Sequence, residues 1–426
     1  MHAVLGPRDD QRRPGPLTLP LRPTHAVVDL DALASNYRAI ALSLPPGCAV
    51  MPVVKADGYG HGAAHVAKRL AAEGATIFAV AVVEEGLELR RAGITQPILV
   101  MGWIGRDQIA SLVQGGLTAN IHSVEQAEEL KIFLEGEEGE REGKGNRPLA
   151  VHLKLDTGMT RLGVQPADMP RVLDLLDGLG KEKIFLEGVF QNFASSDRPG
   201  DTQNEAQAHT FEEIFSQVLA RGHRPTMVHT DNSAAMLSRL ANLSFSSPSK
   251  KSSSFSISHV RPGLALYAPV PGLSSEANDS LRGVMSFVSV VDQVKTVPAG
   301  TRVGYGGTFV CSRETTLAIV PAGYADGVPR SLSGHGAVLI AGKRCPLAGR
   351  VSMDLTTVDV TDLPSPPRRG DEVVFFGDQG GARLGVDEVA AAAGTVPWEI
   401  LCGVGPRVPR IILSGGKIVA RESKFL

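Results

Sequence analysis

From residue 25 onward the chain alternates short apolar runs with longer amphipathic stretches, and this alternation limits the possible folds most strongly. The apolar runs lie at residues 49–54, 77–82, 97–101, 117–121, 150–155, 185–190, 226–229 and 260–266. Between most of them the apolar residues recur with the period of a helix, as in residues 203–221. Strands that alternate with helices form parallel sheets, so eight repeats over about 240 residues predict a (β/α)8 barrel of the TIM type.

The main alternative to a barrel is a doubly wound open sheet. Such a sheet often carries a Gly-x-Gly-x-x-Gly turn after its first strand, and this chain has none there, so a dinucleotide site has little support. Before the first repeat, residues 26–30 are expected to form a lead-in strand. Asp31 is expected to cap a helix that runs to about residue 44.

After about residue 273 the pattern changes. The β-rich runs at 284–297, 301–310, 315–321, 336–341, 345–360 and 371–376 are separated by glycine and proline turns, and helical periodicity nearly vanishes apart from residues 386–393. The sequence therefore predicts an α/β plus β fold with three parts. These are a disordered N-terminal lead at 1–24, a barrel at 25–272 and a mainly β C-terminal domain at 273–426.

Two segments interrupt the predicted barrel. Residues 135–147 are rich in Glu, Gly and Lys and have nothing apolar to bury. Residues 244–258 hold nine serines in fifteen positions, which is typical of a mobile loop. Both are expected to be surface loops.

Composition narrows the function classes. The net charge of −2 argues against a nucleic-acid or anionic-membrane partner, because such surfaces usually carry a basic excess. Neither a signal peptide nor a run of membrane-spanning length is evident. The four cysteines (Cys48, Cys311, Cys345 and Cys402) lie far apart without metal-ligand spacing, and we expect free thiols, a cytoplasmic location and no metal site.

Lys55 ends the apolar run at 49–54 and is followed at once by a glycine-rich turn and a helical pattern. In a barrel this places the amine at the carboxyl end of the strands, where catalytic groups collect. Shielding from water there favours the neutral amine that attacks carbonyl groups. A surface lysine that closes a strand is the alternative, but Gly58, Gly60 and Gly62 favour a site because they let backbone amides approach an anion.

Eight segments, in register over roughly residues 25–412, resemble the alanine racemases. They are Val53-Val-Lys-Ala-Asp-Gly-Tyr-Gly-His-Gly62, Lys154-Leu-Asp-Thr-Gly-Met-Thr-Arg-Leu-Gly163, Asn232-Ser-Ala-Ala235, Arg261-Pro-Gly-Leu-Ala-Leu-Tyr267, Gly304-Tyr-Gly-Gly-Thr-Phe309, Pro321-Ala-Gly-Tyr-Ala-Asp-Gly327, Gly349-Arg-Val-Ser-Met-Asp354 and Arg407-Val-Pro-Arg410. The resemblance implies a pyridoxal 5'-phosphate barrel, a β domain and a homodimer with shared active sites. It also implies interconversion of L- and D-alanine, which supplies D-alanine for cell-wall peptidoglycan.

The resemblance gives two residues catalytic tasks. Lys55 would bind the cofactor and act as the base on one face of the substrate, and Tyr305 of the partner subunit would act on the opposite face. A free phenol is a poor base at neutral pH, so a cationic neighbourhood must favour its deprotonated form.

The resemblance also assigns the binding residues. Arg261 would hold the pyridine nitrogen, and Arg161 would contact the cofactor's phenolic oxygen and the substrate carboxylate. Lys154 matches a position that is carbamylated in many relatives. The phosphate would lie among Tyr59, Ser233, Gly263 and Leu264. From the partner, Met353 would offer its backbone amide to the substrate carboxylate, while Asp354 and Tyr324 would line the entrance.

Each matched residue also has a purely structural interpretation. Ser233 could serve only to begin a helix, Tyr324 could close a turn, Arg161 could be a surface charge and Met353 could fill the core. The common register of all eight segments favours the functional interpretation.

Two positions depart from the family pattern. Asn192 stands where racemases usually carry a histidine that links the base tyrosine toward the ring-binding arginine, although His229, the next member of that linkage, is present. Asparagine cannot carry a proton or a charge. Pro406 replaces a common tyrosine near the entrance. These departures leave open a racemase of broader specificity. A non-catalytic pyridoxal-phosphate-binding protein is a second alternative, from a different class. The complete second domain argues against the non-catalytic protein. A decarboxylase of this fold is disfavoured by Ser352-Met-Asp354.

Overall fold

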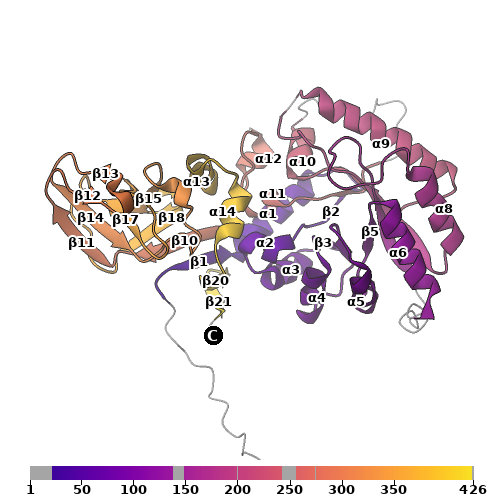
Figure 1. Cartoon of the computed structure of the whole chain (residues 1–426), viewed down its shortest axis with the longest axis horizontal. Coiled ribbons are helices and arrows are strands. Elements are labelled where there is room, and N and C mark those ends of the chain that lie inside the picture. The colour runs from indigo at the N-terminus through magenta and orange to yellow at the C-terminus, as the bar shows by residue number, and fades with distance from the viewer. Residues whose placement is uncertain (1–21, 138–147, 199, 242–255, 274, 425–426) are drawn as a thin grey trace, which may run out of the picture.

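The computed structural model describes residues 22–137, 148–198, 200–241, 256–273 and 275–424. Within them the chain forms an α/β barrel and a mainly β domain that lie side by side, as Figure 1 shows with the barrel on the right. The predicted fold class is confirmed. The two expected surface loops fall largely on residues 138–147 and 242–255, outside the described residues.

Eight parallel strands form the barrel in the described residues. They are β2 (Ala49–Val50), β3 (Phe78–Val80), β4 (Ile98–Val100), β5 (Ala119–Ile121), β6 (Leu149–Lys154), β7 (Ile184–Phe190), β8 (Met227–His229) and β9 (His259–Val260). Strands β5 to β8 pair in sequence, as do β3 with β4 and β9 with β2. Single bridges join the remaining neighbours and close the circle: Val53 with Ala79, Leu99 with Thr118, and Asn232 with Arg261.

Helices surround this barrel. They are α1 (Leu30–Ser43), α2 (Lys55–Gly60), α3 (Ala63–Ala72), α4 (Val83–Arg91), α5 (Ile109–Gln114), α6 (Val124–Glu135), α8 (Met169–Leu179), α9 (Thr202–Ala220), α10 (Ser233–Leu240), α11 (Leu264–Tyr267) and α12 (Glu276–Asp279). Their buried residues recur every three to four positions, as in α8 with Met169, Val172, Leu173, Leu176 and Leu179. The longer of these helices therefore cover the outside of the barrel with one apolar side.

The barrel interior has its own small apolar core. It consists of Met51, Val53, Ile77, Ala79 and Leu99. These residues alternate along their strands, because successive side chains of a strand point to opposite faces. Apolar residues on both faces explain why the strands appear in the sequence as continuous apolar runs.

The second domain is built from strands and two helices. Its strands are β10 (Met285–Val290), β11 (Gln293–Val297), β12 (Arg302–Val303), β13 (Phe309–Val310), β14 (Thr315–Val320), β15 (Ala337–Ile340), β16 (Lys343–Pro346), β17 (Thr356–Asp359), β18 (Glu372–Gln379), β19 (Ala382–Leu384), β20 (Arg410–Ser414) and β21 (Lys417–Glu422). The main sheet runs β16-β15-β18-β10-β1-β20-β21, and β11-β14-β17 form a smaller sheet. Helices α13 (Val386–Ala393) and α14 (Pro397–Gly403) return toward the barrel (Figure 1).

Strand β1 (His25–Asp29) belongs to the second domain's sheet and not to the barrel. It pairs antiparallel with β10 and parallel with β20. The sequence predicted only a lead-in strand, because a strand's partners are not encoded in its own residues. The expected helix cap is also corrected: Asp29, not Asp31, accepts the backbone N–H groups of Asp31 and Ala32.

Residues 22–24, which the sequence places in a disordered lead, are among the described residues and contact the second domain. Thr24 is buried and hydrogen-bonds Ser289 and the Pro321 carbonyl. The Arg22 guanidinium lies 2.5 Å from the buried Asp326 carboxylate, which Arg407 also binds at 2.7 Å. Residues 22–24 are therefore ordered on the second domain.

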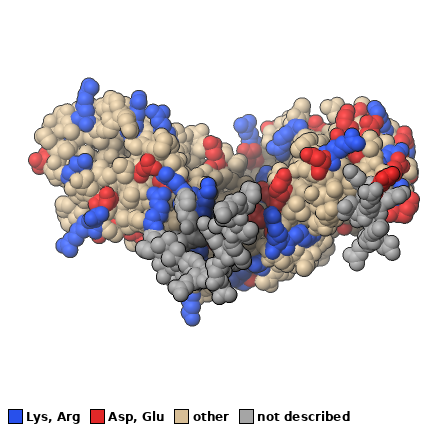
Figure 2. All heavy atoms as spheres, turned by 60° about the horizontal axis from the view of Figure 1, so that its bottom comes forward, with Lys and Arg blue, Asp and Glu red and all other residues tan. Residues whose placement is uncertain are grey.

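Charged side chains of both signs are scattered over the face drawn in Figure 2. Among the described residues no helix is both long and apolar enough to cross a membrane.

Candidate active site

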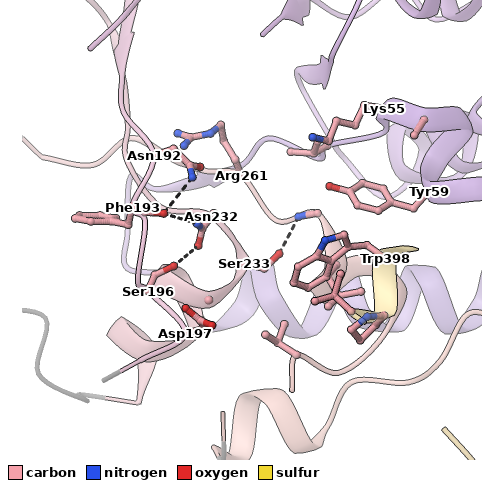
Figure 3. A pocket seen from close by; sticks show the side chains of 18 of the residues that line it. Lys55, Tyr59, Asn192, Phe193, Ser196, Asp197, Asn232, Ser233, Arg261 and Trp398 are labelled. Carbon is pink, nitrogen blue, oxygen red and sulfur yellow. Dashed lines mark hydrogen bonds between the residues drawn. The ribbon is translucent and has the colours of Figure 1, made fainter. Parts of the chain in front are cut away.

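A cavity of about 900 Å³ opens at the carboxyl end of the barrel strands. Nine of the residues singled out from the sequence line it: Lys55, Tyr59, Lys154, Arg161, Asn192, Ser233, Arg261, Gly263 and Leu264. In Figure 3, Lys55, Tyr59 and Trp398 lie on one side of this space, and Arg261 and Asn192 lie on the other. The fold thus gathers residues that are more than 200 positions apart in the chain.

Lys55 begins a turn of unusual conformation. Ala56, Asp57, Gly58 and Tyr59 have φ values of 51, 55, 61 and 54°, which make one turn of left-handed helix. This conformation costs roughly 1–2 kcal/mol for each residue with a side chain. Two carboxylates hold the turn: Glu85 accepts the Ala56 N–H at 2.6 Å, and Asp57 accepts the Ala63 N–H at 2.7 Å. The turn delivers both Lys55 and Tyr59 to the cavity.

Tyr59, Ser233 and Gly263 meet at one end of the cavity. Ser233 is the first residue of α10. Its hydroxyl accepts hydrogen bonds from the N–H groups of Gly263 and Ala265 at 2.9 and 3.2 Å. The Tyr59 hydroxyl lies so close to Gly263 that a Cβ there would overlap it. Burial raises the pKa of Tyr59, so the phenol keeps its proton and can donate a hydrogen bond. These groups suit an anion with several oxygens.

Positive charge dominates the cavity wall. Among the described residues that line it, four are lysines or arginines (Lys55, Lys154, Arg161 and Arg261), and two are carboxylates (Asp197 and Asp387). Burial, together with the charges of Arg161, Arg261 and Lys55, lowers the pKa of Lys154 to about 8. A cationic wall of this kind favours a ligand with several negative charges.

Arg261 is buried, and both of its terminal nitrogens are already engaged. Nη1 donates to Nδ1 of His229 at 3.0 Å and to the His229 carbonyl. Nη2 donates to the carbonyls of Gln191 at 2.5 Å and Thr230 at 3.3 Å. The Nε–H group is therefore the donor left to face the cavity. Burial lowers the pKa of Arg261 to about 10, which still leaves it charged at neutral pH.

Asn192 lines the cavity but does not connect to Arg261. Its side-chain amide donates to the Met159 sulfur at 3.3 Å and to the Phe193 carbonyl at 3.1 Å. Within the described residues it makes no hydrogen bond to Arg261, so the linkage expected of a histidine at this position is missing.

Four predicted residues lie outside the cavity, on the second domain. Tyr305 follows β12 and is 71 % exposed, and Met353 and Tyr324 are 53 % and 43 % exposed. Tyr324 N–H binds the Ser352 carbonyl at 3.0 Å, which joins two of these loops, and Asp354 pairs with Arg407 at 2.8 Å. Within one chain, therefore, Tyr305 does not line the cavity that contains Lys55. Tyr305, Tyr324 and Met353 are instead exposed on the second domain.

The sequence did not identify the contribution of α14. Trp398 and Cys402 line the cavity beside Tyr59, and Trp398 lies next to Ser233 in Figure 3. The available signal was Pro397 at the first position of a short helix, which predicts the helix but not its location.

Comparison with known proteins assigns the chain to a family. A model of the alanine racemase N-terminal domain matches residues 28–271, and one of the alanine racemase C-terminal domain matches residues 284–412. The chain belongs to the alanine racemase family. Its two domains follow one another in the order that this family's models have, so the resemblance predicted from the sequence is confirmed, and the enzyme class is that of the amino-acid racemases.

Individual racemases agree along nearly their whole length. Alanine racemase 2 of Caldanaerobacter subterraneus is 38% identical over 399 residues, which cover 93% of this chain and 97% of that protein. The crystal structure of a Bacillus anthracis alanine racemase with bound L-Ala-P superposes with a TM-score of 0.82 at 33% identity, covering 96% of this chain and 99% of the other. The crystal structure of a Bartonella henselae alanine racemase with covalently bound pyridoxal phosphate superposes with a TM-score of 0.77 at 29% identity. The match covers 92% of this chain and 99% of the other.

Proposed function

We propose that the protein interconverts L- and D-alanine with pyridoxal 5'-phosphate as its cofactor. The observation that carries this proposal is the cationic cavity around Lys55, which ends in the cradle of Tyr59, Ser233 and Gly263. The Bartonella racemase holds pyridoxal phosphate covalently, and the Bacillus racemase binds L-Ala-P, which supports the same cofactor and substrate class here.

The cavity residues fit this cofactor. A phosphate suits the end formed by the Tyr59 hydroxyl, the Ser233 hydroxyl and the backbone at Gly263 and Leu264, where the missing Cβ leaves room. Lys55 supplies an amine for an aldehyde, and Arg261 offers its Nε–H to a ring nitrogen. The cofactor, when bound, withdraws electrons from the α-carbon of an amino acid.

The residues around the cofactor then transfer the proton, bind the substrate and hold the ring nitrogen. Lys55 binds the cofactor and, once released by substrate, moves the α-proton on one face. Arg161 binds the substrate carboxylate through charge-assisted hydrogen bonds. Arg261 does not give up its proton readily, so a ring nitrogen beside it stays unprotonated, which favours return of the proton to the α-carbon. His229 supports Arg261 through the 3.0 Å contact between Nδ1 and Nη1.

Tyr305 of the partner subunit is proposed as the base on the other face. Tyr305, Tyr324 and Met353 are exposed on the second domain of a single chain, and a two-fold dimer can place that surface over the cavity of the other chain. In this arrangement the Met353 backbone amide faces the substrate carboxylate, and Asp354 and Tyr324 line the entrance. We therefore propose a homodimer with two shared sites.

The alternative of broader substrate specificity rests on Asn192, whose side chain turns to Met159 instead of to Arg261. A non-catalytic pyridoxal-phosphate protein is the other alternative, and the exposed Tyr305 surface argues against it. The cellular role that we propose is supply of D-alanine for peptidoglycan in the cytoplasm. Two observations support it: the relatives compared above are bacterial racemases, and the four thiols of this chain are free.

One experiment tests the activity and its range. The purified protein is incubated with pyridoxal phosphate in deuterated water. L-Alanine, L-serine and L-lysine are each added in a separate reaction, and the products are separated on a chiral column. We expect D-alanine with deuterium at the α-carbon to form fastest. The absence of both D-alanine and α-deuterium would exclude racemisation, and faster conversion of lysine than of alanine would exclude alanine as the preferred substrate.

A further inference from the structure

A chain of hydrogen bonds leads from Arg261 into the barrel, away from the cavity. Arg261 Nη1 lies 3.0 Å from Nδ1 of His229. Nε2 of His229 lies 2.7 Å from Nδ1 of His152, and Nε2 of His152 lies 3.2 Å from the Glu187 carboxylate. This series of hydrogen bonds joins the Arg261 guanidinium to the Glu187 carboxylate through two imidazoles.

The surrounding backbone is shaped for this chain. A Cβ at position 188 would lie 2.6 Å from Nδ1 of His152, so only Gly188 leaves space for that ring. The pairing of β6 with β7 shifts between Val151 and His152, which leaves Glu187 as an extra residue on β7. Such a bulge redirects a side chain, here toward His152. Phe190 stacks on His229 with centroids 4.8 Å apart and fixes the plane of its ring.

All hydrogen bonds in this series must be donated in one direction, from Arg261 toward Glu187. Arginine can only donate, so Nδ1 of His229 accepts and its proton is on Nε2. That proton is donated to Nδ1 of His152, whose own proton is then on Nε2 and is donated to Glu187. Both imidazoles are fully buried, and burial lowers the pKa of each, so they are neutral at neutral pH.

The charged and titratable neighbours of these hydrogen-bonded residues include His259, Asp231 and Lys154, whose pKa is lowered in part by the charge of Arg261. His259 lies near both imidazoles and Glu187, and its pKa is also lowered by burial. Asp231 acts on Arg261 but is engaged with Arg239 at 2.7 Å. Glu187, whose side chain is 20 % exposed, is therefore the carboxylate at the end of the chain.

We propose that His152 and Glu187 are positioning residues that fix the tautomer of His229 and set how strongly Arg261 donates to the cofactor's ring nitrogen. The part of this inference that concerns the cofactor rests on the proposed function. The Glu187 charge polarises both imidazoles and makes His229 a stronger acceptor for Nη1. The stronger hydrogen bond at Nη1 lowers the positive charge on the Nε–H group that faces the cavity, so this group becomes a weaker donor. The chain thereby helps to keep the ring nitrogen unprotonated.

The first test locates the protons directly, in the full-length protein without cofactor. Neutron diffraction from crystals of the deuterated protein should show deuterium on Nε2 of both His229 and His152. Deuterium on Nδ1 of either ring would overturn the proposal. This measurement does not depend on racemase activity, so it remains decisive even if the proposed function is wrong.

The second test uses the protein loaded with pyridoxal phosphate and the substitution Glu187→Gln, which keeps an acceptor for His152 but removes the charge. We expect transamination to rise about tenfold relative to racemisation. In transamination the amino group of alanine stays on the cofactor and pyruvate is released. The ratio of pyruvate to D-alanine and the cofactor's absorption spectrum are the measurements. An unchanged ratio and spectrum would overturn the proposal.

A matched control is available on the barrel surface. Glu213 pairs with His209 at 3.4 Å, and both side chains are largely exposed. Glu213→Gln removes the same charge from a histidine–glutamate pair that is not connected to Arg261, and it should leave the ratio unchanged. A rise of equal size in this control would overturn the assignment to Glu187. Absence of racemisation in the unsubstituted protein would instead count against the proposed function alone.

Discussion

The Tyr59 hydroxyl and Gly263 lie so close that a Cβ on Gly263 would overlap the hydroxyl oxygen and lie 3.0 Å from the ring carbon that bears it. Gly263 has a negative φ, so it is required for space and not for backbone conformation. Its N–H also binds Ser233, and the three residues form the proposed phosphate cradle.

Gly263→Ala should therefore weaken cofactor binding. The added methyl group displaces Tyr59 from the cradle, and we expect the dissociation constant for pyridoxal phosphate to rise about 100-fold or more, as for the loss of a buried anchoring contact. Fluorescence titration of the cofactor-free protein measures it. Gly403→Ala is the control, because a Cβ there meets nothing within 4 Å. Equal affinities of the two variants would contradict a phosphate site at Gly263.

The shared site predicts that two inactive variants complement each other. Lys55→Ala and Tyr305→Phe are each expected to be inactive in racemisation as homodimers. A mixed dimer has one site with both substitutions and one site with neither. After unfolding and refolding an equal mixture, we expect about a quarter of the unsubstituted specific activity, because half of the dimers are mixed and one of their two sites is intact.

Complementation also distinguishes the possible arrangements of the bases. If Lys55 and Tyr305 acted within one chain, the mixture would stay inactive. Isotope exchange gives an independent check: Tyr305→Phe should slow exchange of the α-proton of L-alanine much more than that of D-alanine. Equal slowing of both exchange rates would contradict the assignment of one base to each face.

Lys154 is expected to react with carbon dioxide. Its pKa of about 8, lowered by burial and by Arg161, Arg261 and Lys55, leaves a large neutral fraction at pH 8. A neutral amine adds CO2 and releases a proton to form a carbamate, and this anion would compensate Arg161. With 13C-labelled bicarbonate we expect one carbamate signal that disappears as the pH falls below 8, since the protonated amine does not react.

The control for the carbamate signal is a pair of substitutions. Lys154→Gln should abolish the signal, whereas Lys131→Gln on α6 should keep it. A signal that persists without Lys154 would assign the carbamate to another amine.

Asp326 is expected to make stability depend on pH. Burial alone would raise its pKa, but hydrogen bonds from Arg22, Arg407 and the Gly323 N–H lower it below the ordinary value. A lowered pKa in the folded state stabilises the protein above the unfolded value of about 4, and this stabilisation is lost as the pH falls through the folded value. Asp326→Asn should cost about 2 kcal/mol at pH 7, because it removes the charge that accepts hydrogen bonds from two partly exposed arginines.

Denaturant unfolding between pH 7 and pH 3 checks the prediction for Asp326. The difference between Asp326→Asn and the unsubstituted protein should shrink as the pH falls. Asp362→Asn is the control, since its exposed pair with Arg313 should contribute less than about 1 kcal/mol. A difference that is constant across this pH range would show that the carboxylate charge does not contribute.

The barrel was predictable because each of its strands is a separate apolar run, followed by a helix with its own period. The cavity residues were predictable in part for the same reason. Lys55, Lys154 and Arg261 lie within or just beyond strands, and the carboxyl ends of parallel strands meet at one place.

Features that depend on distant partners were not predictable. Strand β1 looks like the start of a barrel, but its partners β10 and β20 lie far along the chain. Trp398 reaches the cavity only because α14 packs against α2, and no local pattern encodes that contact. The pairing of His152 with Glu187 depends on a bulge, which a two-residue period does not reveal.

The position of β1 has a consequence for how the protein is made. β1 takes part in the second domain's sheet between β10 and β20, and its residues 26–29 pair with Arg410, Ile411, Ile412 and Leu413. A ribosome releases the first of these strands long before it has synthesised the last. The barrel helices have local neighbours and can form during translation, whereas the sheet that contains β1 can close only after β20 has been synthesised. A nascent chain that stops short of residue 410 therefore keeps one edge of β1 unpaired, which makes truncated products targets for chaperones and aggregation.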